Sequence, residues 1–181
     1  GSGTYTISNG TLNVSGDVVN GAGTGTLNID GGTVNAGTIG VDNLNIANSA
    51  GTNGSHTLGS GESISTGNET IGNSGTGTFT QTGGTNTVSN DLNIGNNSGS
   101  SGTYNLSAGT NTVSNSLVLG FSSGSNGTFN LSGTGNLDSS YVFVGREDTG
   151  VFTQTGGTHS VSNDLNIGIN SGSSGTYNLS G

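Results

Sequence analysis

Apolar side chains in this chain recur in short alternating runs that are separated by glycine, asparagine and serine. In one stretch, Tyr104 and Leu106 alternate with polar residues, Val113 centres a second run, and Leu117 and Leu119 belong to a third. A period of two bounded by turn residues is typical of β-strands, and the sequence shows no apolar period of 3.6 residues. The pattern therefore predicts about three short strands in each such stretch and no helices.

The same pattern returns in successive units of similar length over nearly the whole chain. The second unit is the longest and is interpreted as carrying an insertion. Self-similarity at a fixed period is the signature of a repeat architecture. In order, the units cover residues 4–25, 26–54, 55–77, 78–102, 103–127, 128–150 and 151–175.

A longer period lies on top of the short one. Residues 78–108 match residues 151–181 at 26 of 31 positions, so the unit that begins at position 151 repeats the one that begins three units earlier. We interpret residues 1–181 as one continuous solenoid, with irregular coils over 1–77 and regular coils over 78–181. The unfinished unit that starts at Thr176 leads us to expect a segment of a larger protein, or a subunit that a neighbour continues.

Short strands without crossover helices predict an all-β fold, a single-stranded β-solenoid (β-helix) with about three strands per coil and about seven coils. Neighbouring coils would lie about 4.8 Å apart, so that equivalent residues stack in columns. One coil buries too few apolar side chains to offset the ordering of its backbone, and stacking must supply the rest. The expected core columns are Phe79, Tyr104, Phe129, Phe152 and Tyr177; Val88, Val113 and Val161; Leu92, Leu117 and Leu165; and Ile94, Leu119, Val144 and Ile167.

The repeat motif resembles a known group of proteins. Units of the form G-T-[YF]-x-L-S-G-G-T-x-x-V-S-x-D-L-x-I-G, best seen in TYNLSAGTNTVSNSLVLG over 103–120, are similar to the autotransporter-associated and PEP-CTERM-associated repeats of large bacterial surface proteins. The resemblance covers almost all of the chain and is weakest over 26–77. It implies a secreted, fibrous β-solenoid segment at a bacterial surface, and it brings no catalytic residues with it.

Composition excludes several classes of function. Glycine provides 38 of the 181 residues, whereas proline, cysteine, methionine and tryptophan are absent, and charged residues make up 6%. The net charge is −9 and the one basic side chain is Arg146, so neither nucleic-acid binding nor attraction to an anionic membrane is expected. No apolar run is long enough for a transmembrane helix, and no membrane insertion is expected.

Candidate catalytic residues are few, and no enzyme activity or cofactor is expected. His159 takes the repeat position of Asn86 and Asn111, which we assign to the outward side of a strand, and His56 belongs to an irregular coil. The acids are scattered, apart from Glu147 and Asp148 beside Arg146, which we interpret as a solvated local ion pair.

Metal and ice binding are weaker alternatives. The stretch Asp91–Gly95 opens like an EF-hand loop, but Gly102 stands where the bidentate glutamate belongs, so we expect alternating strand residues and no metal. Thr78, Thr80 and Thr82 form an outward T-x-T row of the kind that could order water. The next coils break that row with asparagine and serine.

Two main hypotheses of function remain, with ice binding as a third. The first is a structural protein that forms or extends an extracellular bacterial fibre by head-to-tail stacking with itself or with neighbouring repeats. The second is an adhesin segment that binds glycans, which the abundant asparagine and threonine would suit, although most aromatic residues are assigned to the core.

Overall fold

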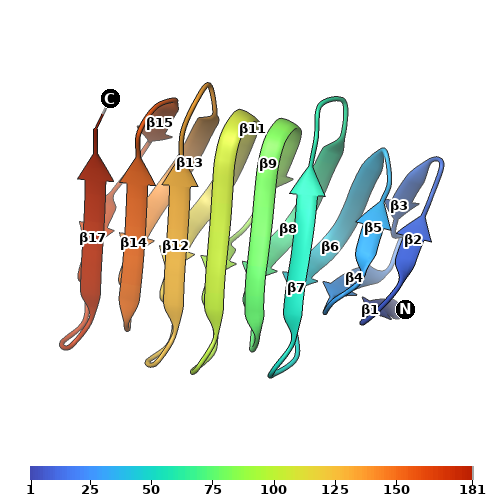
Figure 1. Ribbon diagram of the computed structural model, residues 1–181, viewed down its shortest axis with the longest axis horizontal. Helices are drawn as coiled ribbons and strands as arrows, with labels where there is room; N and C mark the ends of the chain where they lie inside the picture. Colours follow the sequence, from blue (N-terminus) through green and yellow to red (C-terminus); the bar gives the residue numbers. More distant parts are fainter. Residues whose placement is uncertain (181) are drawn as a thin grey trace.

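The computed structural model describes residues 1–180, and in this range all regular structure is β-strand. Fifteen strands join one parallel sheet that winds through the molecule, and two more form a small parallel pair (Figure 1). The predicted all-β solenoid of about seven coils is confirmed. The strands are β1 (Ser2–Ile7), β2 (Thr11–Asn13), β3 (Asp17–Val19), β4 (Thr24–Ile29), β5 (Thr33–Asn35), β6 (Thr38–Ile46), β7 (Asn53–Leu58), β8 (Ser63–Ile71), β9 (Thr76–Val88), β10 (Leu92–Ile94), β11 (Ser101–Leu119), β12 (Asn126–Leu131), β13 (Asn136–Val144), β14 (Thr149–Gln154), β15 (Thr158–Val161), β16 (Leu165–Ile167) and β17 (Ser174–Leu179).

From β7 onwards, each coil contributes to three parallel faces, which the chain visits in the order A, B, C. Face A consists of β7, β12, β14, β17 and the first parts of β9 and β11. Face B consists of β3, β15 and the parts of β6, β8, β9, β11 and β13 that pair with one another. Face C consists of β1, β4, β10, β16 and the last parts of β6, β8, β11 and β13. In the first two coils, β2 and β5 lie between the face C and face B strands.

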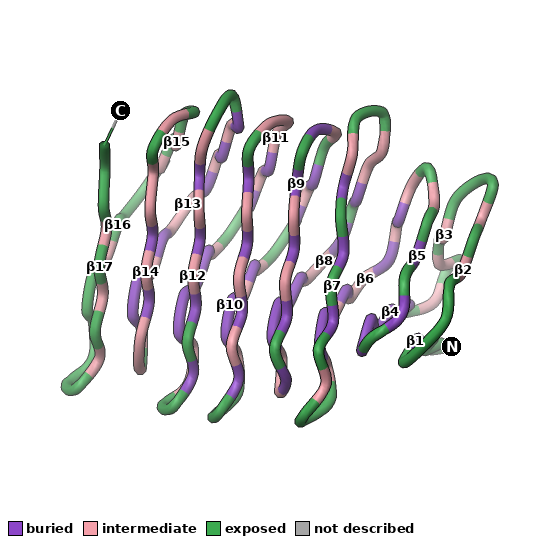
Figure 2. Tube along the Cα trace, in the orientation of Figure 1, coloured by how far each residue is buried: buried purple, intermediate pink, exposed green. Residues whose placement is uncertain are grey.

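The core is a set of side-chain columns along the long axis, seen as the recurring buried segments in Figure 2. The aromatic residues expected to stack are paired in register on face A, from Phe79 to Tyr177. The leucine and isoleucine columns occupy face C, where Val142 stands between Leu117 and Leu165. The valine column is on face B and includes Ser139 between Val113 and Val161.

Burial is complete in the middle coils and incomplete in the last ones. The fully or almost fully buried members of the expected columns are Phe79, Val88, Leu92, Ile94, Tyr104, Val113, Leu117, Leu119, Phe129, Val144 and Phe152. Val161 and Tyr177 are partly buried, and Leu165 and Ile167 are exposed because no described strand lies beyond them.

The unit 26–54 differs from its interpretation as a long coil with an insertion. Leu27 on β4 pairs with Leu44 on β6, only 17 residues later, so both residues lie on face C. Thr26 therefore does not begin a face A strand, and the unit contains two face C strands around one short coil. The remaining pairings return to the longer spacing of the other coils, as in the pairing of Ile39 with Ile64.

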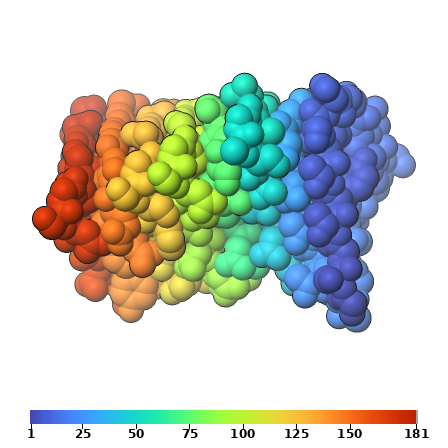
Figure 3. All heavy atoms as spheres, turned by 90° about the horizontal axis from the view of Figure 1, so that it is seen from below, coloured from blue at the N-terminus to red at the C-terminus, as the bar shows by residue number. Residues whose placement is uncertain are grey.

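The stacked coils form a continuous elongated body with its two termini at opposite ends (Figure 3). The described residues include no helix that is long and apolar enough to cross a membrane.

Candidate functional sites in the interior and on the lateral faces

A column of six rings occupies the interior behind face A. It begins at His56, whose ring centroid lies 5.5 Å from that of Phe79. From Phe79 to Tyr177, successive centroids are 4.5 to 5.0 Å apart and the rings are close to parallel. This spacing is that of adjacent coils, so the stacking follows directly from the register.

A polar cluster interrupts the apolar interior where β8, β9 and β11 meet. Glu69 is fully buried and occupies the leucine column of face C, between Leu44 and Leu92. The Asn86 Nδ2 atom donates to Glu69 Oε2 over 2.8 Å and to the Tyr104 hydroxyl over 3.1 Å. The cluster is continued by Gln81, whose Oε1 accepts a 2.6 Å bond from the Tyr104 hydroxyl.

This cluster is incompletely paired. Buried polar atoms without a hydrogen-bond partner include Thr66 Oγ1, Glu69 Oε1, Asn86 Oδ1 and both amide atoms of Asn111. Burial raises the pKa of the Glu69 carboxyl from 4.5 to about 7, and the bond from Asn86 opposes that rise. No basic side chain offsets its charge, because Arg146, the only one in the chain, lies over the Phe121 ring.

A second polar cluster uses the same repeat positions three units later. His159 replaces Asn86, Ser139 replaces Thr66, and Val142 replaces Glu69. The His159 Nε2 atom lies 3.0 Å from Ser139 Oγ, and its Nδ1 atom lies 3.1 Å from the Tyr177 hydroxyl. Both clusters therefore belong to the repeat itself.

The expectation that Asn86, Asn111 and His159 face outward is wrong. Asn86 and Asn111 are fully buried, and the His159 ring stacks on Phe152 at 4.8 Å. His56 is also buried and belongs to the aromatic column. The strand alternation explains the error, because Asn86 lies two residues before the inward Val88 and so shares its side of β9.

The hydrogen bonds around His159 favour one tautomer of its ring. The Tyr177 hydroxyl donates to Gln154 Oε1 over 2.9 Å, so its oxygen accepts the hydrogen from His159 Nδ1. His159 Nε2 is then left to accept the Ser139 hydroxyl hydrogen. Such a pair resembles a nucleophile and its base, but Ser139 is only 6% exposed and its bond is directed to the core. Burial lowers the pKa of His159 to about 4, although the charge of Asp138 opposes this shift.

Replacing His56 by phenylalanine, the residue of neighbouring coils, is expected to remove an acid-sensitive element. Burial lowers the pKa of His56 from 6.5 to about 4, so between these values the unfolded chain binds the proton and the folded chain does not. Wild type should lose up to about 3 kcal/mol from this group as the pH falls from 6.5 to 4. Urea denaturation should therefore give similar free energies of unfolding for wild type and His56→Phe at pH 7.5. At pH 4.5, the free energy of unfolding of His56→Phe should exceed that of wild type. His159 is unchanged in both proteins, and an equal difference at the two pH values would contradict the assignment.

The acidic residues beside Arg146 accept hydrogen bonds from backbone and amide groups of neighbouring coils. Glu147 accepts a bond from Asn170, and Asp148 accepts one from the Gly124 backbone N–H over 2.7 Å. The contact shown for Arg146 is with Phe121, 4.4 Å from the ring centroid. In place of the expected ion pair with Arg146, Glu147 and Asp148 form hydrogen bonds with residues of adjacent coils.

The other expected lateral features lie as the alternation predicts. Asp91 and Asn93 are half-buried, whereas Leu92 and Ile94 are buried between them. Asp91 Oδ1 accepts bonds from Asn115 Nδ2 and the Ser116 backbone N–H in the next coil. The described residues contain no group of three or more histidine, cysteine, aspartate or glutamate side chains that could hold a metal ion.

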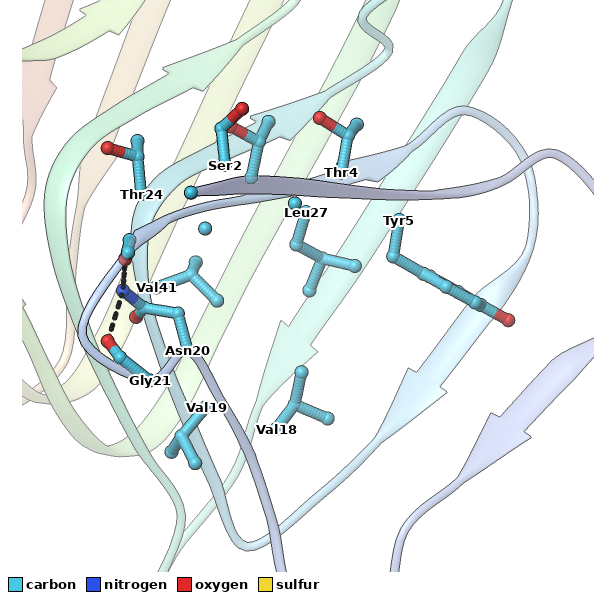
Figure 4. A pocket seen from close by; sticks show the side chains of 15 residues that line it. Ser2, Thr4, Tyr5, Val18, Val19, Asn20, Gly21, Thr24, Leu27 and Val41 are labelled. Atoms are coloured by element: carbon cyan, nitrogen blue, oxygen red, sulfur yellow. Dashed lines mark hydrogen bonds between the residues drawn. The ribbon is translucent and has the colours of Figure 1, made fainter.

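Two depressions lie on the surface. A pocket of about 520 Å³ opens at the first coil, where Tyr5, Val18, Leu27 and Val41 face it and the Asn20 amide bonds to backbone carbonyls at its rim (Figure 4). A groove of about 330 Å³ follows the corner between faces B and C. Sequence analysis did not anticipate this groove. Its lining residues are Thr112, Val113, Ser114, Asp138, Ser139, Ser140, Ser160, Val161 and Ser162.

No protein-family model, no curated protein and no solved structure matches this chain.

Proposed function

We propose that this chain is a structural, non-catalytic repeat protein that forms or extends an extracellular fibre at a bacterial surface. The observation that carries the proposal is that equivalent residues of successive coils pair in register and form continuous columns along the long axis, which a further coil would extend. Leu165 and Ile167 are 43% and 48% exposed, although they continue columns whose other members are buried. At the opposite end Tyr5 is exposed in the same way, beside the pocket of Figure 4.

A further parallel coil would cover these ends. The backbone groups on the outer edges of terminal strands are free to pair with another strand, and the exposed column residues would be buried by the same step. Such a coil comes from neighbouring repeats of a longer chain or from a second copy stacked head to tail. Head-to-tail stacking does not close, so it grows into a filament.

The lateral faces support a fibre because most of their stacked positions are uncharged and several are hydrogen-bonded from coil to coil. Asparagine side chains form bonds of 2.9 Å from Asn130 to Asn105 and from Asn45 to Asn28. Stacked equivalents lie about 4.8 Å apart, where like charges would repel. The low content of charged residues is therefore a requirement of stacking, and it suits a stiff rod.

The proposal assigns no catalytic role and no cofactor to the interior histidines. The tyrosine that His159 contacts is repeated in the other cluster, where the Tyr104 hydroxyl accepts a bond from Asn86, a residue without acid–base chemistry. A role common to both clusters is to satisfy buried polar groups.

Fibre formation is tested by electron microscopy and light scattering of the purified chain at increasing concentration. We expect unbranched filaments, and we expect Leu165→Lys with Ile167→Lys to abolish them because two charges would be buried at each junction. The control carries Ser123→Lys and Ser171→Lys, at exposed corner positions, and should still assemble.

A chain of two copies joined in tandem tests the same stacking without assembly. Its free energy of unfolding should exceed that of one copy, because the junction buries the last coil of the first copy against the first coil of the second. If the single chain stays monomeric and the tandem unfolds as two independent halves, the proposal is overturned.

A further inference from the structure

Aromatic side chains on the outside of the solenoid are confined to one region. Of the nine aromatic residues, five form the core column and Tyr5 faces the open first coil. The other three, Phe121, Tyr141 and Phe143, lie on β13 or at the corner after β11. Tyr141 and Phe143 alternate with the buried Val142 and Val144, which places both rings on the outer side of face C.

These positions are polar in the other coils. The row of Tyr141 otherwise holds threonine, asparagine, aspartate or serine, including Ser116, which pairs with it directly. The row of Phe143 holds asparagine or threonine on most coils, including Asn166, and Val118 on the coil before. Tyr141 and Phe143 therefore make an aromatic patch on an otherwise polar face, and Val118 beneath them is buried.

The groove between faces B and C leads directly to the aromatic patch. Ser140 lines the groove, and Tyr141 follows it with its side chain also outward, because the chain turns the corner between them. The volume of about 330 Å³ is in the range of small-molecule sites. Its polar lining is mainly hydroxyl groups, with the carboxylate of Asp138 as the charged member.

Charge selects among the possible ligands. Asp138 lines the groove, Asp164 holds the position of Tyr141 in the next coil, and the net charge of the chain is −9. Anionic ligands are therefore repelled. Hydroxyl and carboxylate groups beside flat rings suit a ligand with many hydroxyl groups and apolar C–H faces, which is the chemistry of a neutral sugar.

We propose that the groove at Ser140 and the aromatic patch of Tyr141 and Phe143 form a lateral binding site for a neutral polysaccharide. The sugar ring would lie on the aromatic side chains, which are about 7 Å apart along β13. The groove hydroxyls would donate hydrogen bonds to the sugar hydroxyl groups and accept them, and the Asp138 carboxylate would accept them. Because the site is on face C, it stays open when coils stack at the ends, and it does not depend on the proposed fibre.

Affinity electrophoresis tests this site with native gels that contain dextran, a mixed-linkage β-glucan or mannan, and with alginate as an acidic comparison. We expect at least one neutral polysaccharide to retard the chain and alginate not to. Tyr141→Ser with Phe143→Asn, which restores residues of neighbouring coils, should weaken binding at least fivefold. Phe121→Asn is the matched control, since it removes an aromatic ring of the corner after β11 that is not part of the proposed site and introduces the residue found at Asn96.

Each outcome is informative. Circular dichroism and thermal unfolding establish that the variants keep the solenoid. Absence of retardation by all three neutral polysaccharides, retardation by alginate alone, or equal retardation of wild type and the double variant would overturn the proposal. If the double variant instead abolishes lateral association of the chain with itself, the aromatic patch is an interface between copies and the sugar site is refuted.

Discussion

Substitution of Gly127 by alanine is expected to lower the free energy of unfolding by about 3 kcal/mol or more. Gly127 lies near the start of β12 on face A, and a Cβ atom there would lie 2.2 Å from the Ile94 carbonyl oxygen and 2.6 Å from the Gly120 nitrogen. These two atoms form the 3.0 Å hydrogen bond from Gly120 N–H to the Ile94 carbonyl, which joins successive coils. The methyl group has only backbone to displace, so the coils must separate locally.

The effect is one of space and not of backbone conformation. Gly127 has an ordinary negative φ, unlike the glycines at the turns, so alanine could adopt its dihedral angles. Gly3→Ala is the control, because Gly3 is also in a strand and no atom lies within 4 Å of the Cβ position. It should shift stability by less than about 0.5 kcal/mol. Urea denaturation measures both, and equal midpoints for the two variants would contradict this account.

A position where only glycine fits recurs on every coil of face A, beginning with Gly54. This row explains part of the high glycine content of the chain. Similar close contacts with backbone atoms are found at Gly77, Gly102, Gly150 and Gly175. A glycine content of 38 in 181 residues is therefore partly a packing requirement of narrow coils. Sequence analysis assigned the glycines to turns, which explains those with positive φ but not this row.

The fold could be predicted because identical residues recur at a fixed offset. Phe79, Tyr104 and Phe129 are equally spaced along the chain, and parallel pairing in register follows when each coil has the length of that spacing. The first coils could not be placed by the same argument, because the short coil between Leu27 and Leu44 breaks the period. A signal was present nonetheless, since L-N-I occurs at 27–29, 44–46, 92–94 and 165–167, all on face C.

The interior polar clusters were harder to predict because polarity was taken as a sign of exposure. Strict alternation places Asn86 on the side of Val88, and the structure follows alternation against side-chain polarity. The sequence pattern does not predict that Glu69, Asn86 and Tyr104 lie close together. These residues come from three different faces, and only the cross-section of the solenoid brings them together.

Glu69 is expected to make the wild-type solenoid less stable as the pH rises, and Glu69→Gln should remove that loss. The unfolded carboxyl has a pKa of 4.5 and the folded one about 7, so between these values the folded state holds more protons than the unfolded state. The free energy of unfolding therefore falls from pH 4.5 to about 7 and stays low above it. Fully developed, the penalty is about 3 kcal/mol. Below pH 4.5 the carboxyl is protonated in both states, and the two proteins should differ little.

The glutamine variant keeps the shape of the side chain and an oxygen that can accept the bond from Asn86 Nδ2, so the difference isolates the charge. Glu69→Leu restores the residue found at Leu44 and Leu92 and should stabilise further at pH 8, because leucine buries apolar surface.

The histidines contribute a slope of opposite sign between pH 4 and 6.5, but they are common to all these proteins and cancel in the differences. Glu147→Gln, at an exposed position, is the control and should leave the profile of wild type unchanged. Parallel wild-type and Glu69→Gln profiles from pH 5 to 8 in urea denaturation would mean that the carboxyl is not held in an apolar interior. The difference is expected to grow through this range, because the buried carboxylate has no positive partner there and hydrogen bonds to only one of its oxygens.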